Sequence, residues 1–278
     1  MKTLKTLAVL GALGATLFAG TANAGDSPAV SELNGKVAIE GTYHNQKNMT
    51  EEYGGLLLGS LTAPLTNDFG FQADTVLGSH DGESVAGIGG HLFWRDPSKG
   101  LIGITGSYLN LNYAGGLPDH NVTRFGGEGE LYSGDFTLAL TSGYQNGQNV
   151  ADGYYGTATS YWYATDNLRL GIGIANDPVN DMSGNAGVEY QPDFGVQSGM
   201  TFFAGSTVGN DNLVTGQMGI RFYFGKPKSL KLRNREDDPI NNLPGDSITS
   251  GAGDDPVAAC LAKGHYYRWI NGQCRQLD

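Results

Sequence analysis

Residues 135–144 read DFTLALTSGY, and this stretch shows the pattern that determines the fold. Phe136, Leu138 and Leu140 alternate with polar or small residues such as Thr137 and Thr141. An alternation with a period of two places apolar and polar side chains on opposite faces of an extended strand. The stretch therefore predicts a strand with one apolar face and one polar face.

The same period of two recurs between residues 35 and 225, separated by clusters of Gly, Asn, Asp and Pro. No sustained helical periodicity interrupts it. The pattern predicts twelve strands, at residues 36–43, 56–65, 68–77, 84–95, 101–112, 121–132, 135–144, 153–164, 167–175, 184–190, 197–205 and 214–224. Twelve strands of this kind predict an all-β fold.

Composition agrees with this prediction. The 278 residues include 44 Gly, 14 Tyr and 11 Phe, and 16% are charged. An average domain has about 25% charged residues and about 7% Gly. The net charge of −11 argues against a nucleic-acid partner.

The connections between strands alternate in length. They are short after every second strand, as at Thr66-Asn67 and Ser133-Gly134, and generally longer after the others, as at 112–121 and 145–152. This alternation is typical of outer-membrane barrels, which have short periplasmic turns and longer outer loops. A soluble β-sandwich is the rival architecture, but it has no reason to sort its loop lengths. Because backbone groups facing lipid must all be paired, the strands are expected to close into an antiparallel up-and-down transmembrane β-barrel.

The polar faces of these strands carry charged residues that hydrocarbon would not tolerate. We expect these residues to line the lumen of the barrel as a candidate pore: Lys36, Glu40, Asp74, His91, Arg95, Arg124, Glu128, Glu130, Arg169, Glu189 and Arg221. Acidic residues dominate the barrel region, where residues 25–224 contain 7 basic and 21 acidic residues. This excess predicts a preference for cations.

The chain begins with the pattern of a signal peptide over residues 1–24. Lys2 and Lys5 precede an apolar stretch, and Ala22-Asn23-Ala24 forms a small-x-small cleavage site. Residues 25–34 are then a short N-terminal segment before the barrel of residues 35–225. The mature protein is accordingly expected in the cell outer membrane.

The last predicted strand ends in Arg221-Phe222-Tyr223-Phe224 and resembles the aromatic-ending closing strand of Gram-negative outer-membrane β-barrel proteins, porin-like in the broad sense. The resemblance covers residues 1–225 and concerns architecture, without a specific subfamily. It implies outer-membrane lipid and the barrel assembly machinery as partners, and it implies no catalytic residues. The closing strand usually ends the chain, whereas 53 residues follow Gly225 here.

Those 53 residues are expected to form a short periplasmic extension. Residues 226–253 predict a linker, first basic and then rich in Pro and Gly, whose basic part offers a contact for an anionic envelope component. Residues 254–278 predict a small motif with a helix at 256–263. Cys260 and Cys274 are the only two cysteines, and in an exported protein they predict a disulfide.

Two functions of different classes follow. The first is a passive pore for small solutes with a cation preference, and the second is a non-conducting structural or interaction barrel whose loops or tail bind a partner. The sequence contains no HExxH, GxSxG or CxxC motif, so no metal site, cofactor or enzymatic activity is expected. The one enzymatic arrangement considered places His91 beside Thr105 or Ser107 on the next strand as a hydrolase pair.

Overall fold

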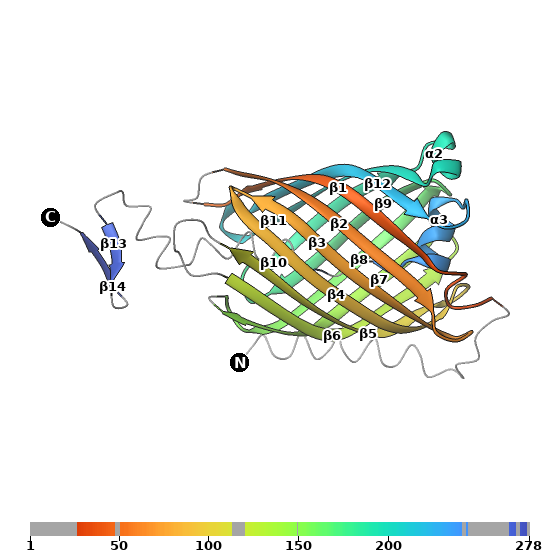
Figure 1. Ribbon diagram of the computed structural model, residues 1–278, viewed down its shortest axis with the longest axis horizontal. Helices are drawn as coiled ribbons and strands as arrows, with labels where there is room; N and C mark the ends of the chain where they lie inside the picture. The colour runs from red at the N-terminus through yellow and green to blue at the C-terminus, as the bar shows by residue number, and fades with distance from the viewer. Residues whose placement is uncertain are drawn as a thin grey trace.

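The computed structural model describes residues 27–47, 51–112, 120–148, 150–240, 243, 267–270 and 273–276. Twelve strands form one closed antiparallel barrel in which each strand pairs with its neighbours in sequence and β1 pairs with β12 (Figure 1). The strands are β1 (Asn34–Asn45), β2 (Glu52–Pro64), β3 (Phe69–His80), β4 (Glu83–Asp96), β5 (Gly100–Asn112), β6 (His120–Ser133), β7 (Phe136–Gln148), β8 (Gly153–Thr165), β9 (Leu168–Asp177), β10 (Asp181–Tyr190), β11 (Met200–Gly209) and β12 (Val214–Phe224). The prediction of a twelve-stranded barrel is confirmed.

Short helical segments accompany the strands. α2 (Asp193–Ser198) connects β10 to β11, η1 (Asn210–Asn212) connects β11 to β12, and α3 (Leu230–Leu232) and η2 (Arg233–Asp237) follow β12. α2 replaces the short turn predicted at residues 192–193, so strand β11 begins at Met200 rather than at residue 197. None of the described helices has the length and apolar character needed to cross a membrane.

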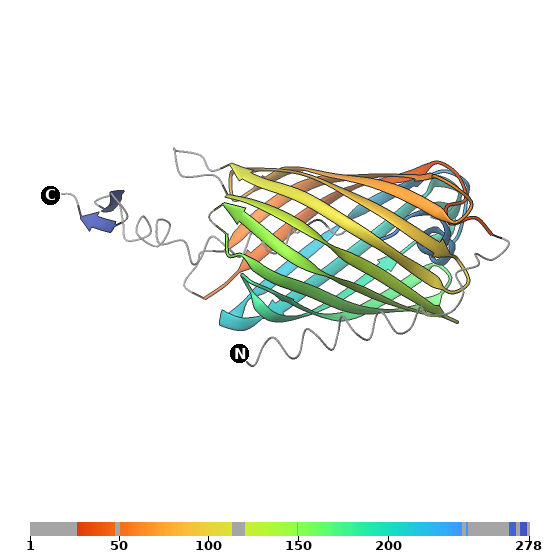
Figure 2. The same cartoon turned by 90° about the horizontal axis from the view of Figure 1, so that it is seen from below.

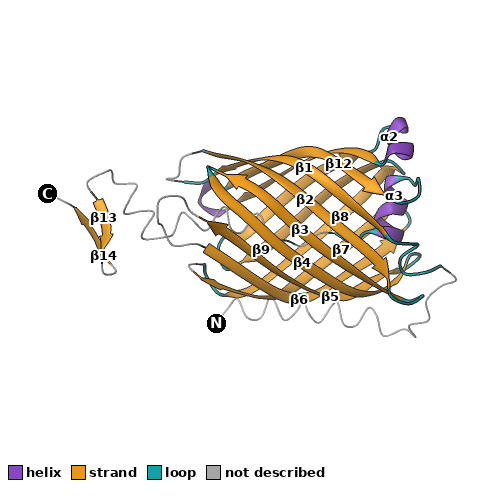
Figure 3. Cartoon of the chain, viewed as in Figure 1, coloured by secondary structure: helices purple, strands orange, loops and turns teal. Residues whose placement is uncertain are grey.

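The two ends of the barrel differ. The turns after β2, β4, β6 and β8 lie at one end together with α2 and α3, and the connections after β1, β3, β5, β7, β9 and β11 lie at the other (Figures 1 and 3). The predicted alternation in length holds only in part, because Asp81-Gly82 is a two-residue turn at the second end, whereas residues 191–199, which include α2, form a longer connection at the first. By the rule that short turns face the periplasm, the α2 and α3 end is the periplasmic end. The side view in Figure 2 shows the strands tilted relative to the barrel axis, as closure of a sheet requires.

The outer surface of the barrel is apolar. Along β9, Ile172 is 70% exposed and Ile174 is 52% exposed, although both are large apolar residues. Aromatic pairs lie near both ends of this surface, with Phe136 stacked on Trp162 near the periplasmic end and Tyr144 against Tyr154 near the other. An apolar band between two aromatic girdles is the surface that a lipid bilayer covers.

A charge on this band is expected to be costly. Ile172→Arg would place a guanidinium in the middle of β9 on the outer face, and we expect a loss of about 2–4 kcal/mol in the free energy of unfolding. Thr159→Arg, on the inner face of the neighbouring β8, is the matched control and is expected to cost much less. Urea unfolding in lipid vesicles measures both, and equal losses would contradict the assignment of faces.

The part of the chain after β12 lies in the barrel. The sequence predicted a linker over residues 226–253, but residues 226–240 and Leu243 pack against the periplasmic opening and the lumen. The N-terminal segment also reaches this opening, where Ala29 and Val30 are buried and Val30 packs on Phe93 and Leu101.

The predicted disulfide and the helix at 256–263 largely fall outside the described residues, which do not include Cys260. In the described part, β13 (Tyr267–Ile270) and β14 (Gln273–Gln276) form a two-stranded sheet in which Trp269 pairs with Cys274. The disulfide therefore stays a prediction, as does the signal peptide at residues 1–24.

Candidate functional site

The lumen of the barrel holds the charged residues singled out in the sequence. The structure places all eleven on the inner face. Asp74, His91, Arg95, Glu128, Glu130 and Glu189 are buried, and Lys36, Glu40, Arg124, Arg169 and Arg221 are partly buried. Their role in lining a pore stays a prediction.

The first group of lumen charges surrounds Glu189 on β10. One carboxylate oxygen accepts hydrogen bonds from Arg221 (2.7 Å), Thr201 (2.9 Å) and Tyr223 (3.0 Å), and the other accepts one from Arg169 (2.6 Å). The carboxylate is therefore shared by two guanidinium groups. These two groups also lie over aromatic rings, Arg169 over Tyr161 and Arg221 over Phe203.

The second group centres on His91 of β4. Its Nε2 lies 2.7 Å from Asp74 Oδ2 and its Nδ1 lies 2.8 Å from Glu128 Oε2. Both ring nitrogens therefore bind carboxylates from β3 and β6, and neither is left to take a proton from the hydroxyl of Thr105. This geometry removes the only support for the hydrolase pair.

The third group joins the barrel to the tail at the periplasmic end. Arg95 Nη1 donates to the backbone oxygens of Ala29 and Asp237, both at 3.2 Å. Thr62 Oγ1 lies 2.8 Å from both Gln72 Oε1 and Asp238 Oδ1. Arg95 and Thr62, whose partners the sequence did not indicate, thus hold the tail at Asp237 and Asp238.

The basic stretch after Gly225 also binds the barrel's own atoms. Lys228 pairs with Asp237 (2.7 Å), Arg235 Nη2 donates to the Phe136 backbone oxygen (2.7 Å), and Lys231 pairs with Asp135 (2.7 Å). At the rim, the hydrogen bond from Lys231 lowers the pKa of the Asp135 carboxyl. The stretch that the sequence offered to an anionic envelope component is therefore engaged mainly with the chain itself.

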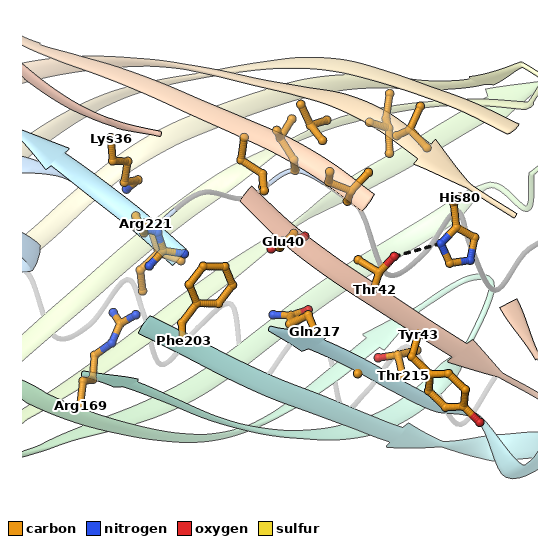
Figure 4. A pocket seen from close by; sticks show the side chains of 18 of the residues that line it. Lys36, Glu40, Thr42, Tyr43, His80, Arg169, Phe203, Thr215, Gln217 and Arg221 are labelled. Atoms are coloured by element: carbon orange, nitrogen blue, oxygen red, sulfur yellow. Dashed lines mark hydrogen bonds between the residues drawn. The ribbon is translucent and has the colours of Figure 1, made fainter. Parts of the chain in front are cut away.

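Unfilled space remains in the lumen beside β8 to β12, and its larger part reaches the apolar residues of β2 to β5 on the opposite wall. A cavity of about 340 Å³ and a second of about 300 Å³ share lining residues on β8, β9, β11 and β12: Tyr161, Arg169, Phe203, Gln217 and Arg221. Figure 4 shows Arg169, Arg221 and Phe203 grouped at one side of the larger cavity, with Gln217 and Thr215 further along. Small residues such as Gly171, Gly187 and Gly205 line the second cavity and leave this wall open.

The opposite wall of the lumen is apolar in the half near the long loops. Val76, Val85, Leu109, Leu111 and Val122 form a buried cluster on the inner face. Three barrel residues also pack against this cluster, namely Leu56, Leu58 and Val150. Leu243 of the tail packs against it as well. This apolar patch was not predicted from the sequence. The available signal was the stretch 56–65, which is apolar on both faces instead of alternating.

Within the described residues, no group of three or more His, Cys, Asp or Glu side chains is arranged to hold a metal ion. The lumen contains paired charges, a tail that enters from the periplasmic end, and unfilled space beside β8 to β12. Together with the closed barrel and its apolar outer band, this arrangement defines an outer-membrane β-barrel protein, porin-like in the broad sense.

Comparison with known proteins shows a similarity of fold alone. No family model and no curated protein matches the sequence. Among solved structures, the KdgM porin in complex with disordered oligogalacturonate has a TM-score of 0.50 at 12% identity, over 68% of this chain and 99% of that chain. The translocator domain of the autotransporter NalP from Neisseria meningitidis has a TM-score of 0.47 at 12% identity, over 80% and 96% of the two chains. Outer membrane phospholipase A from Escherichia coli has a TM-score of 0.48 at 11% identity, over 69% and 96%.

Proposed function

We propose that the protein is a passive outer-membrane pore for small solutes, narrowed by its own C-terminal tail. The observation that carries the proposal is the unfilled space in the lumen beside β8 to β12, where Tyr161, Arg169, Phe203, Gln217 and Arg221 border both unfilled volumes. The larger volume also reaches Leu56, Val85 and Leu111 on the opposite wall, so unfilled space extends across the lumen, which a barrel that served only as a scaffold would not need.

The charge distribution supports a preference for cations. The five basic and five acidic lumen residues balance, so the lumen itself contributes little net field. Residues 25–224 nevertheless have 14 more acidic than basic residues, and many of the acidic ones lie in loops, such as Glu51, Asp81 and Asp152. Acidic loops at the outer mouth raise the local concentration of cations.

Planar-bilayer recording of the mature protein, residues 25–278, tests this proposal. We expect discrete conductance steps and, across a salt gradient, a reversal potential of the sign that cation passage produces. A reversal potential of the opposite sign would remove the cation preference and keep the pore. Silence from protein that is folded by circular dichroism and heat-modifiable mobility would overturn the pore.

The alternative is a non-conducting barrel whose loops or tail bind a partner. It is favoured by the pairing of the lumen charges, as at Glu189 and His91, and by the docking of residues 233–239 across the periplasmic opening. The same recording separates the two functions, because a lumen closed by these contacts would carry no current.

A further inference from the structure

The path of the chain after β12 can be followed from contact to contact, and it leads away from the periplasm. At the periplasmic rim, the Lys226 backbone N–H donates to Glu32 Oε1 (3.1 Å) and the Lys231 N–H donates to the Asp166 oxygen (2.9 Å). Leu230 N–H donates to Asn167 Oδ1 (3.2 Å) in the turn between β8 and β9. The segment therefore begins beside the short turns.

The next residues lie inside the barrel. Asp238 binds Thr62, which stands two residues from the periplasmic end of β2, and Lys36 Nζ donates to the Pro239 oxygen (3.0 Å). Ile240 lines the larger cavity. From residue 230 to residue 240, the chain has thus moved from the rim into the lumen.

Leu243 lies deeper still. It packs against the apolar cluster that contains Val85 and Leu111, which stand close to the ends of β4 and β5 at the long loops. A Cβ atom added to Gly89, in the middle of β4, would lie 3.2 Å from Leu243 Cδ2. Leu243 has therefore reached at least the middle of the barrel, on the far side of the residues that hold Asp238.

On the periplasmic side of Leu243, the tail itself takes up part of the lumen. The tail between residues 233 and 239 contacts side chains or backbone atoms on strands from opposite sides of the barrel: Lys36 on β1, Thr62 on β2, Gln72 on β3, Arg95 on β4, Tyr132 on β6, Thr137 on β7, Tyr163 on β8, Arg169 on β9 and Tyr223 on β12. A chain that turned back toward the periplasm would have to pass between these contacts. The route toward the long loops requires no such passage.

The remaining chain is long enough to leave by that route. Six residues of β4 separate Gly89 from Glu83 at the long-loop end, which is a depth of about 15 Å for a strand tilted by about 40°. About six extended residues cover this distance, and 35 residues follow Leu243. Figure 1 shows the hairpin β13–β14 beyond the end of the barrel opposite α2 and α3.

We infer that the C-terminal chain passes through the lumen of its own barrel and displays the hairpin of residues 267–276 on the outer face of the membrane. In this topology, only the residues around Lys226, at the periplasmic rim, lie on the periplasmic side that the sequence predicted for the whole tail. This topology does not depend on whether the lumen conducts, so a silent bilayer recording would leave it unaffected.

Labelling of single cysteines on intact cells tests the topology. Cys260→Ser leaves Cys274 as the only cysteine, in the hairpin itself. With a polyethylene-glycol maleimide too large to cross the outer membrane, we expect Cys274 to be labelled as fully on intact cells as on permeabilised cells. Labelling only after permeabilisation would place the hairpin in the periplasm and overturn the inference.

Two matched variants calibrate the assay, each made in a chain without Cys260 and Cys274. Ser98→Cys, exposed in the turn between β4 and β5, is expected to react only after permeabilisation. Glu51→Cys, exposed just before β2 at the long-loop end, is expected to react on intact cells. Trypsin added to intact cells with the unmodified chain is an independent readout, since it should remove the C-terminus after Lys263 or Arg268; an intact C-terminus would count against display.

Discussion

Ending the chain after Gly225 is expected to raise the single-channel conductance several-fold. The deletion removes the residues that cross the periplasmic opening, among them Arg235, which donates to Thr137 and to the Phe136 oxygen, and Asp238, which binds Thr62. The closing strand β12 and its pairing with β1 stay intact. The truncated chain also ends just after Phe224. Its aromatic closing strand then stands at the C-terminus, as it usually does in the outer-membrane barrels that this chain resembles.

A chain ending after Gly253 is the matched control for this deletion. It lacks the C-terminal motif but keeps residues 226–243 and their contacts in the lumen. Its conductance is expected to equal that of the full-length mature protein in the same planar-bilayer recording. Equal conductance for the chains ending at 225 and 278 would show that the tail does not obstruct the passage of ions.

Replacing Glu189 by Ala is expected to lower the free energy of unfolding by about 3–5 kcal/mol. The carboxylate is 2% exposed and is the hydrogen-bond acceptor for both Arg169 and Arg221. Its removal leaves two neighbouring guanidinium groups on one wall of the lumen without the carboxylate they share, and it also leaves Thr201 without its acceptor. Urea unfolding in lipid vesicles measures the loss.

Glu51→Ala removes the same charge from an exposed position before β2, where Glu51 accepts a hydrogen bond from Tyr53 at 3.1 Å. A change within about 0.5 kcal/mol is expected there. If Glu189→Ala cost no more than this control, water would be able to replace the carboxylate, and the cluster would be a solvated lining of the pore instead of a structural element of the barrel.

Much of the barrel could be predicted from the sequence because its pattern is local. Alternation over a strand such as 135–144 shows both the strand and its two faces, and a lipid-covered sheet must close. The same alternation placed Asp74, Glu189 and the other strand-borne charges on the inner face. Even where a boundary was wrong, as at α2, the error was limited to a few residues next to a turn.

The contacts inside the lumen could not be predicted in this way. Glu189 meets Arg221 across 32 positions of sequence, Arg235 meets Thr137 across 98, and Asp238 meets Thr62 across 176. No local pattern connects such residues. The basic and Pro-containing stretch after Gly225 reads as a solvated linker, because its composition is polar and its partners lie on strands far away in the chain.

By itself, the sequence determined that this chain forms a membrane barrel of twelve strands with an apolar outside and a charged inside, since period-two alternation and backbone pairing in lipid allow little else. Only the tertiary structure decided what fills that inside. Closing the sheet brings β1, β4, β7 and β12 around one lumen, and their polar groups there bind each other and the tail because buried charges need partners. The closed barrel thus supplies the contacts that hold the chain after β12 inside the lumen instead of away from it.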